Sequence, residues 1–251
     1  FFPQIHRPGE LCESDFTHMD DLRITIQGQL YSHMLYHFVL TYSNWESVDI
    51  CYSENFESLS TGIQNALWKL GGVPQKHRTD RLSAAVQNLT EEREFTARYK
   101  ALLGHYHLEG QKIQPRKANE NGDVEQSHNR FKEAVDQSLM LRGGRDFDSL
   151  DHYQQFLTKL CNRRNSGRRE RLKEELEQLS SLPARRIEAY RELLLRVSSF
   201  STIAIKGNIY SVNSRLIKEK VNVRLYAQYV EVWYAQRRVE TLPRCSGRSK
   251  Y

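Results

Sequence analysis

Gly9-Glu-Leu-Cys-Glu-Ser-Asp-Phe-Thr-His18 is the stretch that decides the fold of this chain. It predicts a β-strand over residues 10–19 that carries Asp15 among apolar neighbours. Leu11 and Phe16 argue against full exposure of the Asp15 carboxylate. We therefore favour Asp15 as a metal ligand over the alternative, an ordinary carboxylate on an edge strand.

Two further acids stand at comparable places in the first half of the chain. Asp80 ends His77-Arg-Thr-Asp80, a predicted short strand, and Glu125 falls in the first turn of a predicted helix. Taken singly, Asp80 would be a turn or N-cap residue and Glu125 a solvated helix carboxylate. Three converging carboxylates would repel one another unless a cation lies between them, and their oxygens suit Mg²⁺ or Mn²⁺. Two such ions can hold the attacking and leaving oxygens of a phosphodiester.

Composition places the chain among soluble globular proteins of one large domain or two to three small ones. Of its 251 residues 39% are hydrophobic and 27% charged, and neither a membrane-spanning apolar run nor a signal peptide is found. The four cysteines form no Cys-x-x-Cys pair, which argues against zinc and favours a reducing, cytoplasmic location. Because the chain opens on Phe1, we expect it to be a fragment.

Charge is divided unevenly along the chain. Residues 1–140 hold 14 Lys and Arg against 19 Asp and Glu, whereas residues 141–251 hold 23 against 12. The acidic part suits a metal site, and the basic part suits a polyanion such as a phosphate backbone. A merely solvated basic surface is the alternative.

Hydrophobic periodicity predicts alternating strands and helices in the first part of the chain. Strands over residues 10–19, 22–26 and 36–40 are predicted to form an antiparallel meander. A helix follows, capped by Ser53 and stopped by Gly71. The expected apolar stripe of this helix is Phe56, Leu59, Ile63, Leu67 and Leu70. The later predicted elements are a strand reaching Asp80, a helix over 95–106 and an edge strand over 112–115.

The next predicted helix begins near Gly122 and carries the third acid. Glu125, His128 and Lys132 are spaced to share one helix face. His128 fits a packed core histidine and a contact to phosphate equally well. Lys132 is either a solvated charge or a phosphate clamp.

The second part of the chain is predicted to hold a basic helical connector and a small barrel. Arg142-Gly-Gly-Arg145 is the expected boundary. Residues 198–251 carry four period-two segments, with Gly207-Asn208 as a hairpin turn, and predict an antiparallel β-barrel. Five arginines near the end of the connector make a candidate phosphate track, and four aromatic residues are expected in the barrel core: Arg163, Arg164, Arg168, Arg169 and Arg171, and Tyr226, Tyr229, Trp233 and Tyr234.

This order of elements and the short sequence motifs around each acid resemble those of IstA-type insertion-sequence transposases. The catalytic core of that family is of the DDE, retroviral-integrase-like class. The resemblance spans nearly the whole chain. It is carried by Ser14-Asp-Phe-Thr-His-Met19, Phe38-Val-Leu-Thr-Tyr-Ser43, Gly71-Gly-Val-Pro74, His77-Arg-Thr-Asp-Arg-Leu-Ser-Ala-Ala85, Glu120-Asn-Gly-Asp-Val-Glu125, Leu141-Arg-Gly-Gly-Arg-Asp-Phe147, Leu182-Pro183 and Asn208-Ile-Tyr-Ser-Val212.

The resemblance implies a ribonuclease H-like core over residues 1–141, a connector over 142–197 and a DNA-binding or assembly barrel over 198–251. It implies Asp15, Asp80 and Glu125 as catalytic residues and ligands of two Mg²⁺ or Mn²⁺ ions. Because Asp80 and Glu125 are spaced more widely than is usual in integrases, Glu120 and Asp123 are rivals for the third position. Lys132, seven residues after Glu125, favours Glu125.

The resemblance also implies DNA transposition: cleavage at the 3′ ends of an element and strand transfer into a target. His128, Lys132 and the five connector arginines would contact DNA. We expect the family's N-terminal helix-turn-helix region to be missing from this sequence. Members of the family work as homo-oligomers with an AAA+ ATPase helper, in the cytoplasm and on the nucleoid. The alternatives are a ribonuclease H-like nuclease without joining activity and a catalytically silent, transposase-derived DNA-binding protein.

Overall fold

A computed structural model describes residues 6–79, 89–111 and 122–245 of the chain. The chain divides into two compact units. Unit 1 comprises residues 1–50 and 54–187, and unit 2 comprises residues 51–53 and 188–251. Among the described residues, no helix combines the length and apolar character that crossing a membrane requires.

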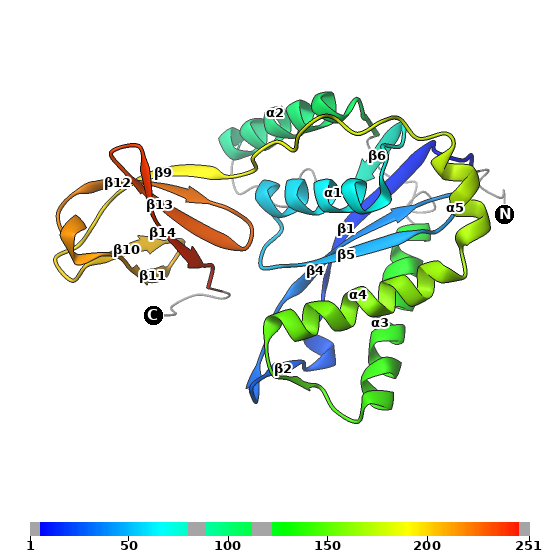
Figure 1. The fold of residues 1–251 in the computed structure, drawn as a ribbon, viewed down its shortest axis with the longest axis horizontal. Coiled ribbons are helices and arrows are strands. Elements are labelled where there is room, and N and C mark those ends of the chain that lie inside the picture. Colours follow the sequence, from blue (N-terminus) through cyan, green and yellow to red (C-terminus); the bar gives the residue numbers. More distant parts are fainter. Residues whose placement is uncertain (1–5, 80–88, 112–121, 246–251) are drawn as a thin grey trace. The chain divides into compact units, whose positions relative to one another are not determined.

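Unit 1 is built on a mixed five-stranded sheet with β1 in its middle (Figure 1). β1 pairs antiparallel with β4 and parallel with β6, so the predicted mixed α/β class is confirmed. The strand order is β5 (Glu46–Cys51), β4 (Met34–Leu40), β1 (Leu11–His18), β6 (Lys76–Thr79) and β7 (Glu109–Gln111).

The predicted meander is wrong in its second strand. Residues 20–22 form a 3₁₀ helix, η1 (Asp20–Leu22), in which the backbone N–H groups of Leu22 and Arg23 bond to the carbonyls of Met19 and Asp20 and not to a neighbouring strand. Only β2 (Thr25–Ile26) is extended, and it joins a separate small sheet with β3 (Gln29–Leu30) and β8 (Asp146–Phe147). The observed neighbours in the large sheet are β1, β4 and β5, and the hydrophobic periodicity of the sequence did not predict β5.

The helix α1 (Phe56–Leu70) confirms the predicted apolar stripe, all of which is buried. Its N-cap is Asn55, whose side chain accepts a hydrogen bond from the backbone N–H of Ser58, and not Ser53 as predicted. Gly71 ends the helix with φ of 85°, a conformation that costs glycine little.

Gly62 lies where α1 packs against the sheet, and it offers a test of that packing. A Cβ added at Gly62 would lie 2.1 Å from Cδ1 of Tyr36, whereas one added at Gly104 would meet nothing within 4 Å. We expect Gly62→Ala to destabilise the protein by about 1–3 kcal/mol through overpacking. Gly104→Ala should stabilise it by about 0.5–1 kcal/mol. Urea unfolding of both variants measures the difference, and equal effects would contradict the packing described.

Helices cover both faces of the sheet. Tyr36 contacts α1, and Tyr99 of α2 (Leu89–Tyr106) bonds to His77 of β6. The opposite face is covered by α3 (Gly122–Arg142) and α4 (Leu150–Ser166), whose buried residues share one core with Leu35 and Val48. The helices over residues 95–106 and from Gly122 are thus confirmed, whereas the predicted edge strand over 112–115 lies outside the described residues.

Residues 142–187 belong to unit 1. Phe147 packs at 4.9 Å, centroid to centroid, against Tyr153 of α4, in the same core as Phe131. The loop at 142–145 is therefore an internal connection, and the change of unit falls after Ile187. The last helix of the unit is α5 (Arg169–Leu176), whose buried Glu175 accepts hydrogen bonds from the backbone N–H groups of Gly9 and Ser43.

Unit 2 consists of two antiparallel sheets around one core of Val, Ile and Leu side chains. The four predicted strands are confirmed as β10 (Thr202–Ile205), β11 (Asn208–Ser211), β12 (Lys220–Leu225) and β13 (Tyr229–Tyr234). β9 (Arg191–Arg196) and β14 (Arg237–Pro243) were not predicted, and η3 (Ser214–Leu216) is a 3₁₀ turn.

Two expectations for unit 2 were wrong in detail. The β10–β11 hairpin turns at Lys206 and Gly207, both with positive φ, one residue earlier than predicted. The aromatic residues expected in the core are not fully buried: Tyr229 and Tyr234 are exposed, and Tyr226 and Trp233 are partly exposed. Branched aliphatic residues fill the core instead.

Candidate active site

Asp15 lies in the middle of β1, directly opposite His37 of β4. Side chains of directly opposed residues share one face of a sheet. That face is the one against which α3 packs, because His37 contacts His128 and Phe131 of α3. The Asp15 carboxylate is half-buried, and its Oδ1 accepts a hydrogen bond of 2.7 Å from the backbone N–H of Phe16. The predicted partial burial is confirmed.

The strand that leads to Asp80 is the immediate neighbour of β1. β6 runs parallel to β1, and its last residue, Thr79, pairs with Ser14. Asp80 itself lies outside the described residues, as does Glu120. The third acid, Glu125, belongs to the first turn of α3 as predicted, and Asp123 shares that turn. The structure thus brings the β1 strand, the β6 strand and the α3 helix together.

Metal-ligand chemistry at this place fits the residues that are described. Asp15 offers a half-buried carboxylate, an oxygen donor of the type that Mg²⁺ and Mn²⁺ prefer. In the part of the chain whose side chains are described, no three His, Cys, Asp or Glu residues gather as a metal site. The side chains of Asp80 and Glu125 are outside that part.

His128 is a buried residue of α3, with 7% of its surface exposed. Its ring stacks on His37 with centroids 4.9 Å apart, and its Nε2 has no hydrogen-bond partner among the described residues. Burial, aided by nearby His37 and Lys132, lowers the pKa of His128 to about 3. The ring is therefore neutral at neutral pH. Lys132, one turn further along α3, is half-buried.

His77 on β6 is a second neutral, buried histidine, held by Ser14 Oγ at 2.8 Å and the Tyr99 hydroxyl at 2.6 Å. Burial lowers its pKa to about 3, as for His128. Both folded pKa values lie below the unfolded value of about 6.5, so the unfolded chain takes up protons first as the pH falls.

We therefore expect stability to be highest above pH 6.5 and to decline as the pH falls from 6.5 toward 3. Each of the two histidines should cost about 2 kcal/mol at pH 5 relative to pH 7. Urea unfolding at both pH values measures the slope. His77→Gln should flatten the slope relative to the wild-type protein, because it removes one of the two buried groups. An unchanged slope in His77→Gln would contradict the assignment.

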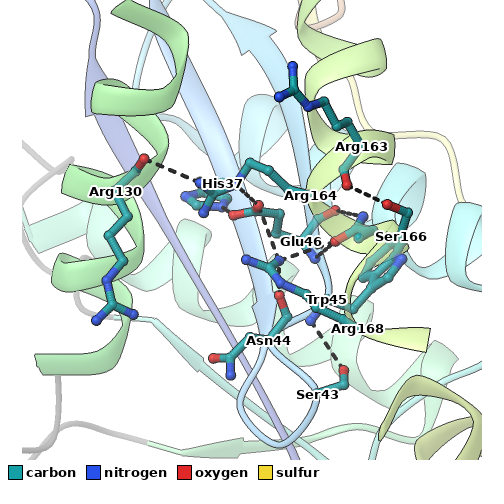
Figure 2. Close-up of polar contacts among 11 residues, drawn as sticks. His37, Ser43, Asn44, Trp45, Glu46, Arg130, Arg163, Arg164, Ser166 and Arg168 are labelled. Carbon is teal, nitrogen blue, oxygen red and sulfur yellow. Dashed lines mark hydrogen bonds and ion pairs between the residues drawn. The ribbon is translucent and has the colours of Figure 1, made fainter. Parts of the chain in front are cut away.

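Glu46, at the start of β5, is the centre of a buried charge network (Figure 2). Its carboxylate accepts hydrogen bonds from His37 Nε2 at 3.1 Å and from Arg164 Nε, and it pairs with Arg168 Nη1 at 3.1 Å. Burial alone would raise the pKa of Glu46, but His37 and the two arginines hold it at about 2. The side chain of Asn165 bonds both the backbone N–H and the backbone carbonyl of Glu46.

The five arginines predicted as a phosphate track therefore differ in their surroundings. Arg164 and Arg168 are only about one-fifth exposed, 21% and 22%, and are bound to Glu46. Arg163 is exposed, and its guanidinium points away from Glu46 (Figure 2). Arg169 and Arg171 are exposed on α5.

A groove of about 820 Å³ lies over the junction between α4 and α5. Four of the five predicted arginines line it, together with Arg130 of α3. Sequence reasoning missed Arg130 and Glu46, because a single arginine on a helix and a single acid after a turn carry no spacing signal. The complete lining is Ser43, Asn44, Ser127, Arg130, Arg164, Ser166, Gly167, Arg168, Arg169, Glu170 and Arg171.

Comparisons with known proteins agree with this architecture. Residues 182–251 match the model of the family described as "Mu transposase, C-terminal domain". The chain is 40% identical over 246 residues to an uncharacterized protein of Sinorhizobium fredii, and 25% identical over 258 residues to a transposase for insertion sequences IS1326/IS1353 of Pseudomonas aeruginosa. These matches cover 97% and 98% of this chain, and the chain spans 49% of each relative's length.

One solved structure aligns along almost the whole chain. It is a simian T-cell lymphotropic virus intasome in complex with PP2A regulatory subunit B56 gamma, with a TM-score of 0.52 at 14% identity, covering 97% of this chain and 79% of that one. This likeness supports the ribonuclease H-like fold. Along nearly its whole length the chain is thus similar to an insertion-sequence transposase, and over residues 182–251 it is similar to the C-terminal domain of Mu transposase.

Proposed function

We propose that the chain is the catalytic part of a DNA transposase, with Asp15, Asp80 and Glu125 as its active-site acids. The observation that carries the proposal is the placement of Asp15. Its carboxylate is half-buried on the middle strand, beside the strand that leads to Asp80 and on the face packed by the helix of Glu125. A half-buried carboxylate at such a place offers oxygen donors of the kind that a cation site needs.

The three acids would hold Mg²⁺ or Mn²⁺, two ions per site, and the bound ions would activate the nucleophile and stabilise the leaving 3′ oxygen. The protein's own contribution is position. The β1–β6 register fixes Asp15 relative to the end of β6, and the packing of Phe131 and His128 fixes the first turns of α3 against the sheet. Such fixed donors lower a barrier without reorganisation during reaction.

DNA is the proposed substrate, as element end and as target. Lys132 would clamp phosphate beside the acids, and His128 could contact it only as a neutral ring. The exposed connector arginines Arg163, Arg169 and Arg171 would hold the backbone further away, with Arg164 and Arg168 contributing their unpaired N–H groups. Homo-oligomeric assembly, an AAA+ helper and the functional division at residues 141 and 197 are further parts of this proposal.

Incubation with labelled element ends and target plasmid in Mg²⁺ or Mn²⁺ tests the function. Joined products would support transposition. Cleaved ends without joined products would favour the ribonuclease H-like nuclease. No metal-dependent cutting at all, with DNA binding retained, would favour the silent DNA-binding protein.

A further inference from the structure

The groove over the α4–α5 junction is strongly cationic although it is partly buried. Five arginines line it, and Glu170 is the only acid among the lining residues that the structure describes. Burial lowers the pKa of Arg168; Glu46 opposes this effect, and the neighbouring Arg164 adds to it. An anion in the groove would reduce the repulsion among the arginines.

Glu46, which does not line the groove, holds two of these arginines in place. It binds Arg164 through Nε and Arg168 through Nη1, and Arg168 Nη1 also donates to the carbonyl of Asn44. Each guanidinium carries five N–H donors, so these contacts fix its plane and leave other donors for a ligand. The groove is therefore pre-organised, which reduces the entropy lost when a ligand binds.

The groove is longer than a single phosphate requires. A second hollow of about 330 Å³ shares four of its lining residues: Asn44, Ser127, Arg130 and Arg171. Ser127 and Arg130 come from the first turns of α3, the helix that also carries Glu125. The two hollows therefore adjoin each other, and part of their shared lining belongs to the helix of the candidate active site.

We propose that this arginine groove is a binding site for consecutive backbone phosphates of duplex DNA. The inference rests on the proposed function, since it names where the DNA of that reaction is held. Arg130, Arg169 and Arg171 supply exposed charges, and Arg164 and Arg168 supply donors held in place by Glu46. Arg163 lies outside the groove and is not part of this site.

The test compares two triple variants of equal charge in the full chain. The first is Arg130→Ala, Arg169→Ala and Arg171→Ala. The matched control is Lys159→Ala, Lys173→Ala and Arg185→Ala, three exposed basic residues of unit 1 that do not line the groove. Fluorescence anisotropy of a labelled duplex, in EDTA and over a salt series, measures binding, and thermal unfolding checks that both variants are folded.

We expect the groove variant to lose at least about 10-fold in affinity, with a salt slope smaller by about 3, and the control to lose less than about 3-fold. Equal losses would show that only overall charge matters and would overturn the site. Competition by micromolar ATP or inorganic phosphate would assign the groove to a small anion and overturn the DNA assignment. If the wild-type protein joins strands and the groove variant binds DNA with unchanged affinity, this inference alone is wrong. If the wild-type protein does not join strands, the proposed function is wrong, and the comparison of DNA affinities remains valid.

Discussion

Asp15→Asn should lower strand joining by at least about 10³-fold while leaving the fold and DNA binding intact. The change removes one charge from a half-buried carboxylate on the middle strand but keeps its size and the hydrogen bond from Phe16 within reach. Loss of a metal ligand removes several kcal/mol of transition-state stabilisation, and each 1.4 kcal/mol is worth about tenfold in rate. Asp80→Asn and Glu125→Gln should behave alike. Gel analysis of joined products from labelled element ends measures all three.

The matched control is Asp21→Asn, the same chemical change at an exposed residue of η1. It should retain joining within about twofold. Normal joining by any of the three variants would remove that residue from the active site. For the third position, Asp123→Asn and Glu120→Gln then identify which acid takes the place of Glu125.

The second large effect is expected at Glu46, where Glu46→Gln should cost about 3 kcal/mol of stability. The substitution leaves Arg164 and Arg168 without their buried counter-charge, and breaking a buried ion pair from one side costs about 3–5 kcal/mol. Because both arginines are about one-fifth exposed, water compensates in part. For a protein of this size the thermal midpoint should fall by roughly 6–12 °C in calorimetry.

Glu133→Gln on the exposed side of α3 is the control for this change, and its midpoint should move by less than about 2 °C. Midpoints that match in the two variants would show that Glu46 does not stabilise the fold. Loss of DNA affinity in a folded Glu46→Gln protein would add that Glu46 also orients the groove arginines.

The sequence predicted the parts of unit 1 whose pattern is local. The strand with Asp15, the stripe of α1 and the helix that begins at Gly122 all follow from periodicity and capping residues, and all are confirmed. The predicted strand over residues 22–26 was wrong at Leu22, where the alternating pattern extends into a 3₁₀ turn. The apolar residues of this turn pack on helices that come more than 100 residues later in the chain. Tertiary packing of that kind leaves no local signal.

The candidate site divides in the same way. The short sequence motifs around each acid predicted whether that acid lies on a strand or on a helix. The bonds of Arg164 and Asn165 to Glu46 join residues more than 100 positions apart, and no local motif predicts them. The arginine run indicated polyanion binding but could not tell Arg164, which is bound to Glu46, from Arg163, which points away. The misplaced aromatic residues of unit 2 show a related limit, because alternation alone does not say which face is inside.

Asn165 has one further effect on β5, which is one of the two outer strands of the five-stranded sheet. An outer strand offers free main-chain groups to which a strand of another molecule can add. Asn165 Oδ1 accepts from the Glu46 N–H at 3.0 Å, and its Nδ2 donates to the Glu46 carbonyl at 2.8 Å, so one side chain imitates a neighbouring strand at the start of β5. We therefore expect a strand from a second copy to pair less readily with β5 at Glu46, which should lower the tendency of this edge to aggregate.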